Sequence, residues 1–321
     1  MSEFTLIIMT TRNSAHDDQP RVTILGLGRM GTALSRALLT ARYRTTVWNR
    51  TPSKAGGLVG LGAERAETPG AAIAASPMTI ICVADYDGVQ EVLDAGRAAL
   101  RERTLVNLTT GTPQDARAMA TRVAGRGAAY LDGAMMAVPQ SVATPSAFFL
   151  YSGSPDAFDR HRHTLDALAT SHYLGNDPAA AELWDFALLG SGYAALTGFL
   201  HSLALLDTEG VPPSRFVPLV AQWLHGMTEY MSELAREIES GDYSAGVSPV
   251  GMNQVAVESL TRVSEHLGID AEVLGPLRAL LERGVARGHG DESFASLFEL
   301  LRQRPSQLPG HDVGPTIART R

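Results

Sequence analysis

A glycine-rich segment near the start of the chain gives the clearest indication of a chemical role: Gly26-Leu27-Gly28-Arg29-Met30-Gly31. An apolar run, VTIL, precedes it and a helical pattern, TALSRALL, follows it, which predicts a strand, a tight turn and a helix. Gly26 permits the tight turn, Gly28 lets the backbone approach a pyrophosphate, and Gly31 lets the helix pack on the strand. Free N–H groups at the start of the helix would face the phosphates. The pattern favours a dinucleotide-binding loop over a glycine-rich turn without a ligand.

The next apolar run, TTVW, leads into a basic segment that contains Asn49, Arg50, Thr51 and Lys54. Sites for NAD usually have Asp or Glu here, bonded to the ribose 2′-hydroxyl, but this segment has no carboxylate. Arg50 offers a planar cation, Thr51 a hydroxyl, and Lys54, the only lysine in the chain, a second cation. We expect these four residues to bind the 2′-phosphate side of NADPH, and a solvated basic turn is the alternative.

Two later apolar runs end in further candidates for cofactor contacts. Val83 ends the run TIICV, and Asn107-Leu108-Thr109 ends the run TLVNL. Open parallel sheets bind ligands beyond the carboxyl ends of their strands. We therefore expect Val83, Asn107 and Thr109 to contact the cofactor, with the last two on its nicotinamide side.

One carboxylate stands in an otherwise uncharged apolar span. Between Leu183 and Leu206 the only formal charge is Asp185. A carboxylate is costly to bury without a partner, so a functional role is favoured. With a raised pKa Asp185 could donate a proton, and in its ionised form it could stabilise a cation. A structural Asp that caps a helix or forms an ion pair at an interface is the alternative.

The elements that must position these residues follow from the hydrophobic pattern. From Arg21 to about Leu174, short β-branched runs alternate with helical stretches, which predicts βαβ units and a largely parallel sheet with an antiparallel edge. No strand pattern returns after Asp177. Asp177 and Pro178 predict the start of a helix that runs to about Asp207. Further helices are expected at 212–238, 250–267, 270–288 and 291–302.

The expected fold class is α/β, with a doubly wound Rossmann sheet, a long interdomain helix and an all-helical C-terminal domain. The expected division of the chain is a disordered leader at 1–19, the NADP-binding domain at 20–176, the interdomain helix at 177–208, the helical domain at 209–302 and a disordered tail at 303–321.

Composition excludes several classes of function. The net charge of −7, without a basic patch, argues against nucleic-acid binding. The single cysteine, Cys82, excludes a disulfide framework and predicts a cytoplasmic location, and the first residues lack the pattern of a signal peptide. Leu183–Leu206 could cross a bilayer by length, but it lacks flanking basic residues. We expect it to be buried in a core or a subunit interface, and we expect no metal site.

Several segments together resemble the imine reductase family, a branch of the β-hydroxyacid dehydrogenase superfamily: GLGRMG, VWNRTPSKA, VNLTTGTPQDAR, YLDGAMMAVP and LYSG. The resemblance covers residues 22–302. It implies two interlocked chains, with each active site between one chain's Rossmann domain and the other's helical domain. It also implies hydride transfer from NADPH to the carbon of a C=N bond, in cyclic imines or in imines formed from a ketone and an amine.

The residues separate this chain from the superfamily's acid dehydrogenases, which use a catalytic lysine early in the interdomain helix. No lysine follows Lys54, and their Ser-Gly-Gly turn for a substrate carboxylate is replaced by apolar residues at 134–139. Such side chains cannot satisfy a carboxylate, so we expect an apolar pocket that includes Met135 and Val138.

The resemblance also implies roles for residues in the helical part of the chain. It places Asp185 at the position of the missing lysine, and it gives Tyr193 the role of positioning the amine, with a core tyrosine as the alternative. Met252 and Asn253 match a helix that lines the family's substrate pocket.

Two other functions stay open. One is a carbonyl or β-hydroxyacid reductase, which the missing lysine disfavours. The other is a non-catalytic NADPH-binding sensor, which would not need a buried Asp beside the nicotinamide. The sequence leaves the stereochemistry open, although by the family resemblance Asp rather than Tyr at position 185 favours (R)-amines.

Overall fold

The computed structural model describes residues 19–244 and 246–302 of the chain. The expected tail, and the expected leader except for its last residue, lie outside the described residues. The chain divides into two compact units, Met1–Ser191 and Gly192–Arg321, and each is described by itself.

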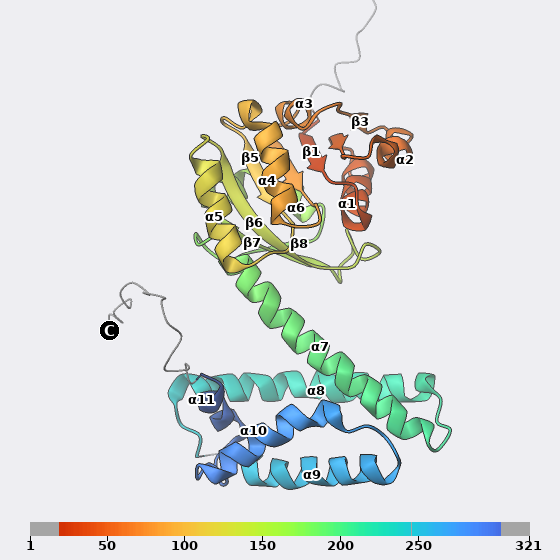
Figure 1. The fold of residues 1–321 in the computed structure, drawn as a ribbon, viewed down its shortest axis with the longest axis vertical. Coiled ribbons are helices and arrows are strands. Elements are labelled where there is room, and N and C mark those ends of the chain that lie inside the picture. Colours follow the sequence, from red (N-terminus) through yellow and green to blue (C-terminus); the bar gives the residue numbers. More distant parts are fainter. Residues whose placement is uncertain (1–18, 245, 303–321) are drawn as a thin grey trace, which may run out of the picture. The chain divides into compact units, whose positions relative to one another are not determined.

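The first unit is built on one eight-stranded sheet (Figure 1). Its strands are β1 (Arg21–Leu25), β2 (Arg44–Trp48), β3 (Glu64–Arg65), β4 (Met78–Ile81), β5 (Thr104–Asn107), β6 (Ala129–Met136), β7 (Phe148–Gly153) and β8 (Thr170–Tyr173). The strand order is β3-β2-β1-β4-β5-β6-β7-β8, and all neighbours pair in parallel except β6 and β7. The order therefore reverses beside β1, and at such a switch point an open sheet binds its ligand.

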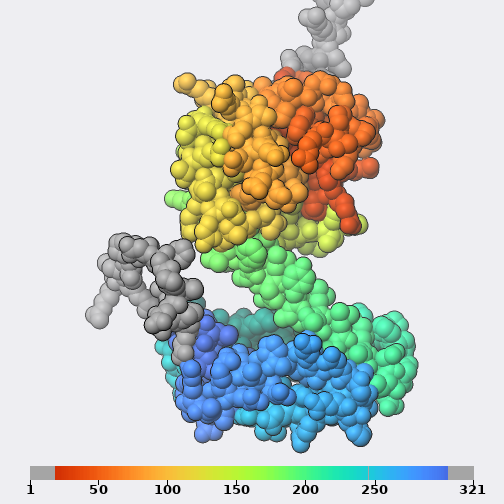
Figure 2. Space-filling view, in the orientation of Figure 1, coloured from red at the N-terminus to blue at the C-terminus, as the bar shows by residue number. Residues whose placement is uncertain are grey.

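Helices cover both faces of this sheet: α1 (Arg29–Thr40), η2 (Pro52–Ala55), α2 (Gly56–Val59), α3 (Pro69–Ala74), α4 (Tyr86–Ala95), η3 (Arg97–Ala99), α5 (Pro113–Ala124) and α6 (Pro155–Asp166). Figure 2 shows α4 and α5 covering the face that is turned to the viewer.

Alternate residues of the strands supply the two cores. One core joins the sheet to α1 and α6 through Ile24, Ile80, Val106, Leu34, Leu38, Phe158 and Leu165. The other joins the sheet to α3, α4 and α5 through Leu25, Ile81, Leu105, Ile73, Val89, Leu93, Met119 and Val123. Burial on both faces explains why the strands read as nearly continuous apolar runs.

The predicted α/β class is confirmed, with corrections of detail. The apolar runs VTIL, TTVW, TIICV and TLVNL form β1, β2, β4 and β5, and the later runs AAYL, AFFLY and SHYL form β6, β7 and β8. Strand β3 was not predicted, because its two residues, Glu64 and Arg65, are exposed and have no apolar pattern. The antiparallel edge is limited to the β6–β7 pair, since β8 pairs in parallel with β7.

Helix α7 (Ala180–Asp207) begins in the first unit and continues into the second. It starts two residues after Pro178, while the Asp177 side chain accepts a hydrogen bond from the Ala179 N–H at 3.1 Å. The second unit adds α8 (Pro213–Ser240), α9 (Val250–His266), η4 (Glu272–Leu274), α10 (Gly275–Ala286), η5 (Phe294–Ser296) and α11 (Leu297–Arg302). The expected helices at 270–288 and 291–302 are therefore each divided into a short 3₁₀ turn and an α-helix.

The second unit has a small core of its own, formed by Val250, Leu281 and Leu297. Many large apolar side chains of α7, α8 and α9 are exposed instead: Tyr193, Leu196, Leu200, Val217, Leu219, Trp223, Leu224, Met231, Met252, Val255 and Val263. By length and composition α7 is also the one helix in the described residues that could span a membrane. The expected burial of Leu183–Leu206 is thus not reached within a single chain.

Candidate active site

The glycine loop between β1 and α1 has the geometry that its sequence predicts. Gly26 has a φ of +99°, and a Cβ atom there would lie 2.1 Å from the Cys82 carbonyl oxygen. A Cβ on Gly31 would lie 1.9 Å from the Gly26 carbonyl oxygen. Around Gly28, the N-cap of α1, a Cβ atom would meet nothing within 4 Å. Gly26 and Gly31 are therefore required by close packing, and the backbone at Gly28 is open to a ligand.

Asn49 braces this loop from the end of β2. Its Oδ1 accepts a hydrogen bond from the Leu27 N–H at 2.9 Å, and its Nδ2 donates to the Thr51 carbonyl oxygen at 3.1 Å. The predicted contact of Asn49 with the cofactor is thus accompanied by a second role, since its side chain holds the glycine loop and the basic segment together.

The basic segment itself is open to solvent. Arg50, Thr51 and Lys54 are all exposed. The only ion pair of Arg50 within the described residues joins its Nη1 to the Glu91 Oε2 at 3.7 Å, and the Arg50 side chain is 87% exposed. Such a pair contributes little to stability, so the guanidinium is available to a 2′-phosphate. The loop and the segment fit NADPH.

Hydrogen bonds join the ends of β4 and β5, and they involve the residues that we expected to contact the cofactor. The Val83 N–H donates to the Thr109 Oγ1 at 3.1 Å. Asn107 is fully buried, and its Nδ2 donates to the Thr109 carbonyl oxygen at 3.4 Å and to Asp132 Oδ2 at 3.3 Å. The Asn107 Nδ2 thus points towards Thr109 and Asp132, and the contact of Asn107 with the nicotinamide side of the cofactor stays a prediction.

Asp185 lies on the part of α7 that belongs to the first unit. Its exposed fraction is 4%, and within the described residues it accepts no hydrogen bond. Burial raises the pKa of its carboxyl group. Its neighbours Leu183, Trp184 and Phe186 are exposed, so α7 buries a narrow polar face and turns its apolar side outward.

Two further buried carboxyl groups in the first unit, those of Asp132 and Glu182, were not predicted from the sequence. Asp132 Oδ2, on β6, accepts hydrogen bonds from the hydroxyl groups of Tyr86 at 2.6 Å and Tyr130 at 2.5 Å. Glu182 Oε1, on α7, accepts one from the Gly111 N–H at 3.0 Å. Burial raises the pKa of both carboxyl groups. The signals available were Asp132 in the buried run YLDGAMM and Glu182 one helical turn before Asp185.

The residues predicted to line the substrate pocket fall in both units. Met135 is half-buried on β6, and Val138 is exposed beyond it. In the second unit Tyr193 is 66% exposed and Met252 is exposed on α9. Asn253 donates from Nδ2 to Ser248 Oγ at 2.7 Å and to the Pro249 carbonyl oxygen at 2.9 Å, which fixes the start of α9.

Two histidines lie on helices of the second unit, His201 on α7 and His225 on α8. His201 is buried in the second unit, with its Nε2 3.1 Å from Ser264 Oγ, as expected of a core histidine. His225 is exposed on α8, so in a single chain it is not a core residue. Among the described residues, no group of three His, Cys, Asp or Glu side chains could hold a metal ion.

Two family models match the chain in succession. Residues 21–175 match the NAD binding domain of 6-phosphogluconate dehydrogenase, and residues 177–303 match the C-terminal domain of NADPH-dependent reductive aminase-like proteins. The boundary between the two matches falls just before α7.

Individual proteins are similar over most of the chain. An NADPH-dependent reductive aminase of Aspergillus oryzae is 39% identical over 88% of this chain and 97% of its own length. A reductive aminase of Aspergillus terreus, in complex with NADPH4, cyclohexanone and allyl amine, is 43% identical with a TM-score of 0.83, over 88% of this chain and 100% of that chain.

An imine reductase of Aspergillus terreus, in complex with NADPH4 and dibenz[c,e]azepine, is 42% identical over 88% of this chain and 99% of that chain, with a TM-score of 0.83. The chain therefore belongs to the family of reductive aminases and imine reductases.

Proposed function

We propose that this chain is an NADPH-dependent imine reductase, which transfers a hydride to the carbon of a C=N bond. The observation that carries the proposal is a buried carboxyl group, Asp185, on α7. By the family resemblance it stands at the position of the lysine in the related acid dehydrogenases. Relatives with 39–43% identity are described as reductive aminases or imine reductases, which supports the same chemistry.

The first unit offers a complete set of groups for NADPH. The N–H groups at the start of α1 face the open space at Gly28 and would bind the pyrophosphate. Arg50, Thr51 and Lys54 would bind the 2′-phosphate, and no carboxylate competes for it at the end of β2. When bound, NADPH supplies the hydride.

Asp185 can supply the proton that the reduction needs besides the hydride. Reduction of a neutral imine to an amine consumes one hydride and one proton. Because burial raises its pKa, the Asp185 carboxyl group holds a proton to higher pH than an exposed Asp and can donate it to the nitrogen. If the substrate arrives as a cationic iminium, the ionised form of Asp185 stabilises that charge.

Two substrate classes fit this site: cyclic imines, and imines formed from a ketone and an amine. The second class is supported by the ketone and amine bound together in the Aspergillus terreus enzyme. The apolar side chains at Met135 and Val138 favour hydrocarbon substituents over a carboxylate. Tyr193, Met252 and Asn253 would line the pocket from the helical domain.

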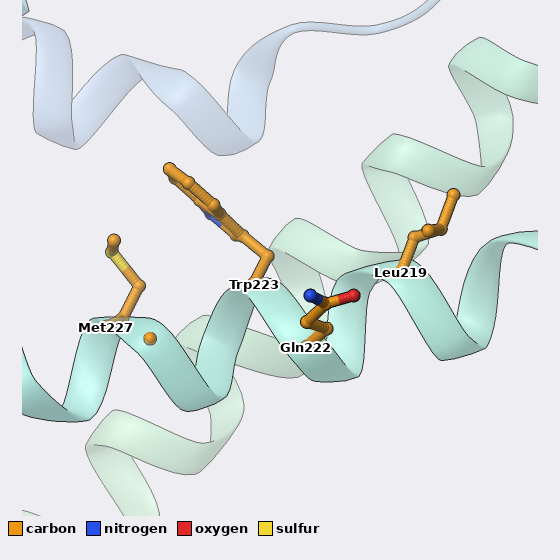
Figure 3. A pocket seen from close by; sticks show the side chains of 5 residues that line it. Leu219, Gln222, Trp223 and Met227 are labelled. Atoms are coloured by element: carbon orange, nitrogen blue, oxygen red, sulfur yellow. The ribbon is translucent and has the colours of Figure 1, made fainter.

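The helical domain is proposed to come from a second copy of the chain, in an interlocked homodimer. The second unit exposes large apolar side chains on three helices, far more than its small core covers. A hollow of about 370 Å³ on α8, lined by Leu219, Gln222, Trp223, Gly226 and Met227, adds a shape into which another apolar helix could pack (Figure 3). The same interface with the second copy would bury the apolar side of α7. A buried α7, together with the single cysteine, supports a cytoplasmic protein rather than a membrane-spanning one.

A screen of NADPH consumption tests the function. The purified protein is given a small cyclic imine, a ketone with an amine, and the ketone alone; oxidation of a hydroxy acid is tested with NADP⁺. We expect turnover of the imine and of the ketone–amine mixture only. Reduction of the ketone alone, or oxidation of the hydroxy acid, would identify a carbonyl or hydroxyacid enzyme. NADPH binding without any turnover would identify a sensor.

A further inference from the structure

Two carboxyl groups, Asp132 and Glu182, lie beside the same hydroxyl group in the interior of the first unit: the Tyr86 hydroxyl is 2.6 Å from Asp132 Oδ2 and 3.4 Å from Glu182 Oε1. Asp132 is 0% exposed and Glu182 is 1% exposed. Within the described residues, no Arg, Lys or His forms an ion pair with either group. Two ionised carboxylates in such surroundings would repel each other in a medium that screens poorly.

Each of the two groups has one oxygen atom without a partner. Asp132 Oδ1 and Glu182 Oε2 are buried and form no hydrogen bond, while the other oxygen of each group accepts bonds from donors. Buried polar atoms are rarely left unpaired. A single proton placed between these two oxygen atoms would give both of them a partner.

We propose that Asp132 and Glu182 share one proton, carried by Glu182, and that the neutral Glu182 is a positioning residue that holds Asp185 at the nicotinamide edge of the sheet. The proposal rests on the proposed function, because it assigns Asp185 to the reaction. Glu182 is the carrier because Asp132 Oδ2 already accepts from Tyr86, Tyr130 and Asn107, which stabilises the charged form of Asp132.

Glu182 connects this pair to the site in two ways, by a hydrogen bond with the loop after Thr109 and by its position on the same helix as Asp185. Its Oε1 accepts the Gly111 N–H, in the loop that follows Thr109. The Tyr86 ring packs closely against that loop, since a Cβ atom on Gly111 would lie 2.2 Å from the ring. Glu182 and Asp185 are three residues apart on α7 and therefore lie on the same face of the helix. The first turn of α7 is thus fixed to the loop that ends β5.

Loss of the shared proton should disturb this arrangement. Ionised Glu182 would face the charges of Asp132 and Asp185. Its donors within the described residues are the Gly111 N–H at 3.0 Å and the Tyr86 hydroxyl group at 3.4 Å, and Tyr86 is also bonded to Asp132 at 2.6 Å. Burial, followed by the charge of Asp132, raises the pKa of Glu182 from 4.5 to about 8. The folded state therefore holds the proton more tightly than the unfolded state does. Stability is greatest below the unfolded value, falls as the pH rises, and levels off above about pH 8.

The test compares the wild type with Glu182→Gln and with Glu182→Leu, and uses Glu102→Gln, at an exposed carboxylate, as the matched control. Gln keeps an acceptor for Gly111 and a donor for Asp132 but cannot ionise. From pH 6.5 to 9, we expect the melting temperature of the wild type and of the control to fall by several degrees more than that of Glu182→Gln. A fall of the same size in Glu182→Gln overturns the shared proton.

Kinetics then test the positioning role, with a permanent N-alkyl iminium as substrate so that the substrate itself does not titrate. We expect kcat to fall at least fivefold between pH 7 and 9 in the wild type but less than twofold in Glu182→Gln. Glu182→Leu should lose at least tenfold in kcat at both pH values, with little change in the KM for NADPH. Equal alkaline losses in wild type and Glu182→Gln overturn the positioning role. The melting temperatures need no substrate, so an inactive protein with the expected melting pattern refutes only the proposed function.

A further measurement leaves Asp132 and Glu182 unsubstituted, so it does not depend on whether the Glu182 variants fold. Infrared difference spectra of Asp185→Asn between pH 7 and 10 should show the loss of one buried carboxylic acid band. Absence of that band at pH 7 overturns the proposal.

Discussion

The Asn49 side chain accepts a hydrogen bond from the Leu27 N–H at 2.9 Å, and this bond holds the glycine loop against the end of β2. The two halves of the cofactor site, which we propose to bind the pyrophosphate and the 2′-phosphate, are thereby joined to each other before any ligand arrives. Such preorganisation reduces the ordering that binding would otherwise require.

Asn49→Ala should raise the KM for NADPH roughly three- to tenfold, because one hydrogen bond of about 1 kcal/mol is lost and the Leu27 N–H is left without its acceptor. The effect should be similar for NADPH and NADH, since the loop binds the pyrophosphate that both contain. Steady-state kinetics with each cofactor measure it. A change in the ratio of the two efficiencies without a change in NADPH affinity would contradict the bracing role.

The preference between the two cofactors is assigned to Arg50. The wild type should favour NADPH over NADH at least tenfold in kcat/KM, about 1.4 kcal/mol. Arg50→Asp should remove most of this preference, because it replaces the cation by a carboxylate that would repel the 2′-phosphate and accept from a 2′-hydroxyl. Glu91→Gln, at the exposed ion-pair partner of Arg50, is the matched control and should keep the preference. Equal efficiencies in the wild type would refute the assignment.

Asp185→Ala should lower the turnover of a neutral imine about a hundredfold or more, the scale usual for an acid–base group. NADPH affinity should barely change, because the glycine loop and the basic segment are separate from α7. Fluorescence titration with NADPH and single-turnover kinetics separate the two effects. Near-normal turnover in a folded Asp185→Ala protein would end the catalytic assignment.

The charge and the proton of Asp185 are distinguished by Asp185→Asn, which keeps the shape of the side chain. If proton donation is its role, a permanent N-alkyl iminium should be reduced by Asp185→Asn at nearly the wild-type rate. If stabilisation of the cation is its role, that substrate should lose as much rate as a neutral imine. A structural role would instead lower the melting temperature and leave turnover intact.

The protein should be a stable homodimer at micromolar concentration in sedimentation experiments. Trp223→Glu should weaken the dimer and reduce activity in parallel, because it places a charge in the apolar hollow of α8. Leu61→Glu, at an exposed apolar residue of the first unit, is the control and should leave the dimer intact. An active wild-type monomer would contradict the interlocked arrangement.

Much of the fold and part of the site could be predicted from the sequence because the signals are local. Alternation of apolar runs with helical stretches determined the α/β class, and the spacing of Gly26, Gly28 and Gly31 determined the cofactor loop. The absence of lysine after Lys54, and a single charge in the apolar span, directed attention to Asp185. None of these conclusions requires knowledge of which distant segments pack against one another, so they could be drawn before the fold was known.

The tertiary structure alone decided which polar groups meet. Asn107 and Asp132 are register partners on neighbouring strands, and Glu182 reaches the same place from a helix fifty residues beyond Asp132 in sequence. Periodicity indicates that a residue is buried but not which strand lies beside it. The order β1-β4-β5-β6 brings Tyr86, Asn107, Asp132 and Glu182 to one edge, where burial raises the pKa values of both carboxyl groups and the charge of Asp132 raises that of Glu182 further. That chemistry is a property of the surroundings, which exist only once the chain has folded.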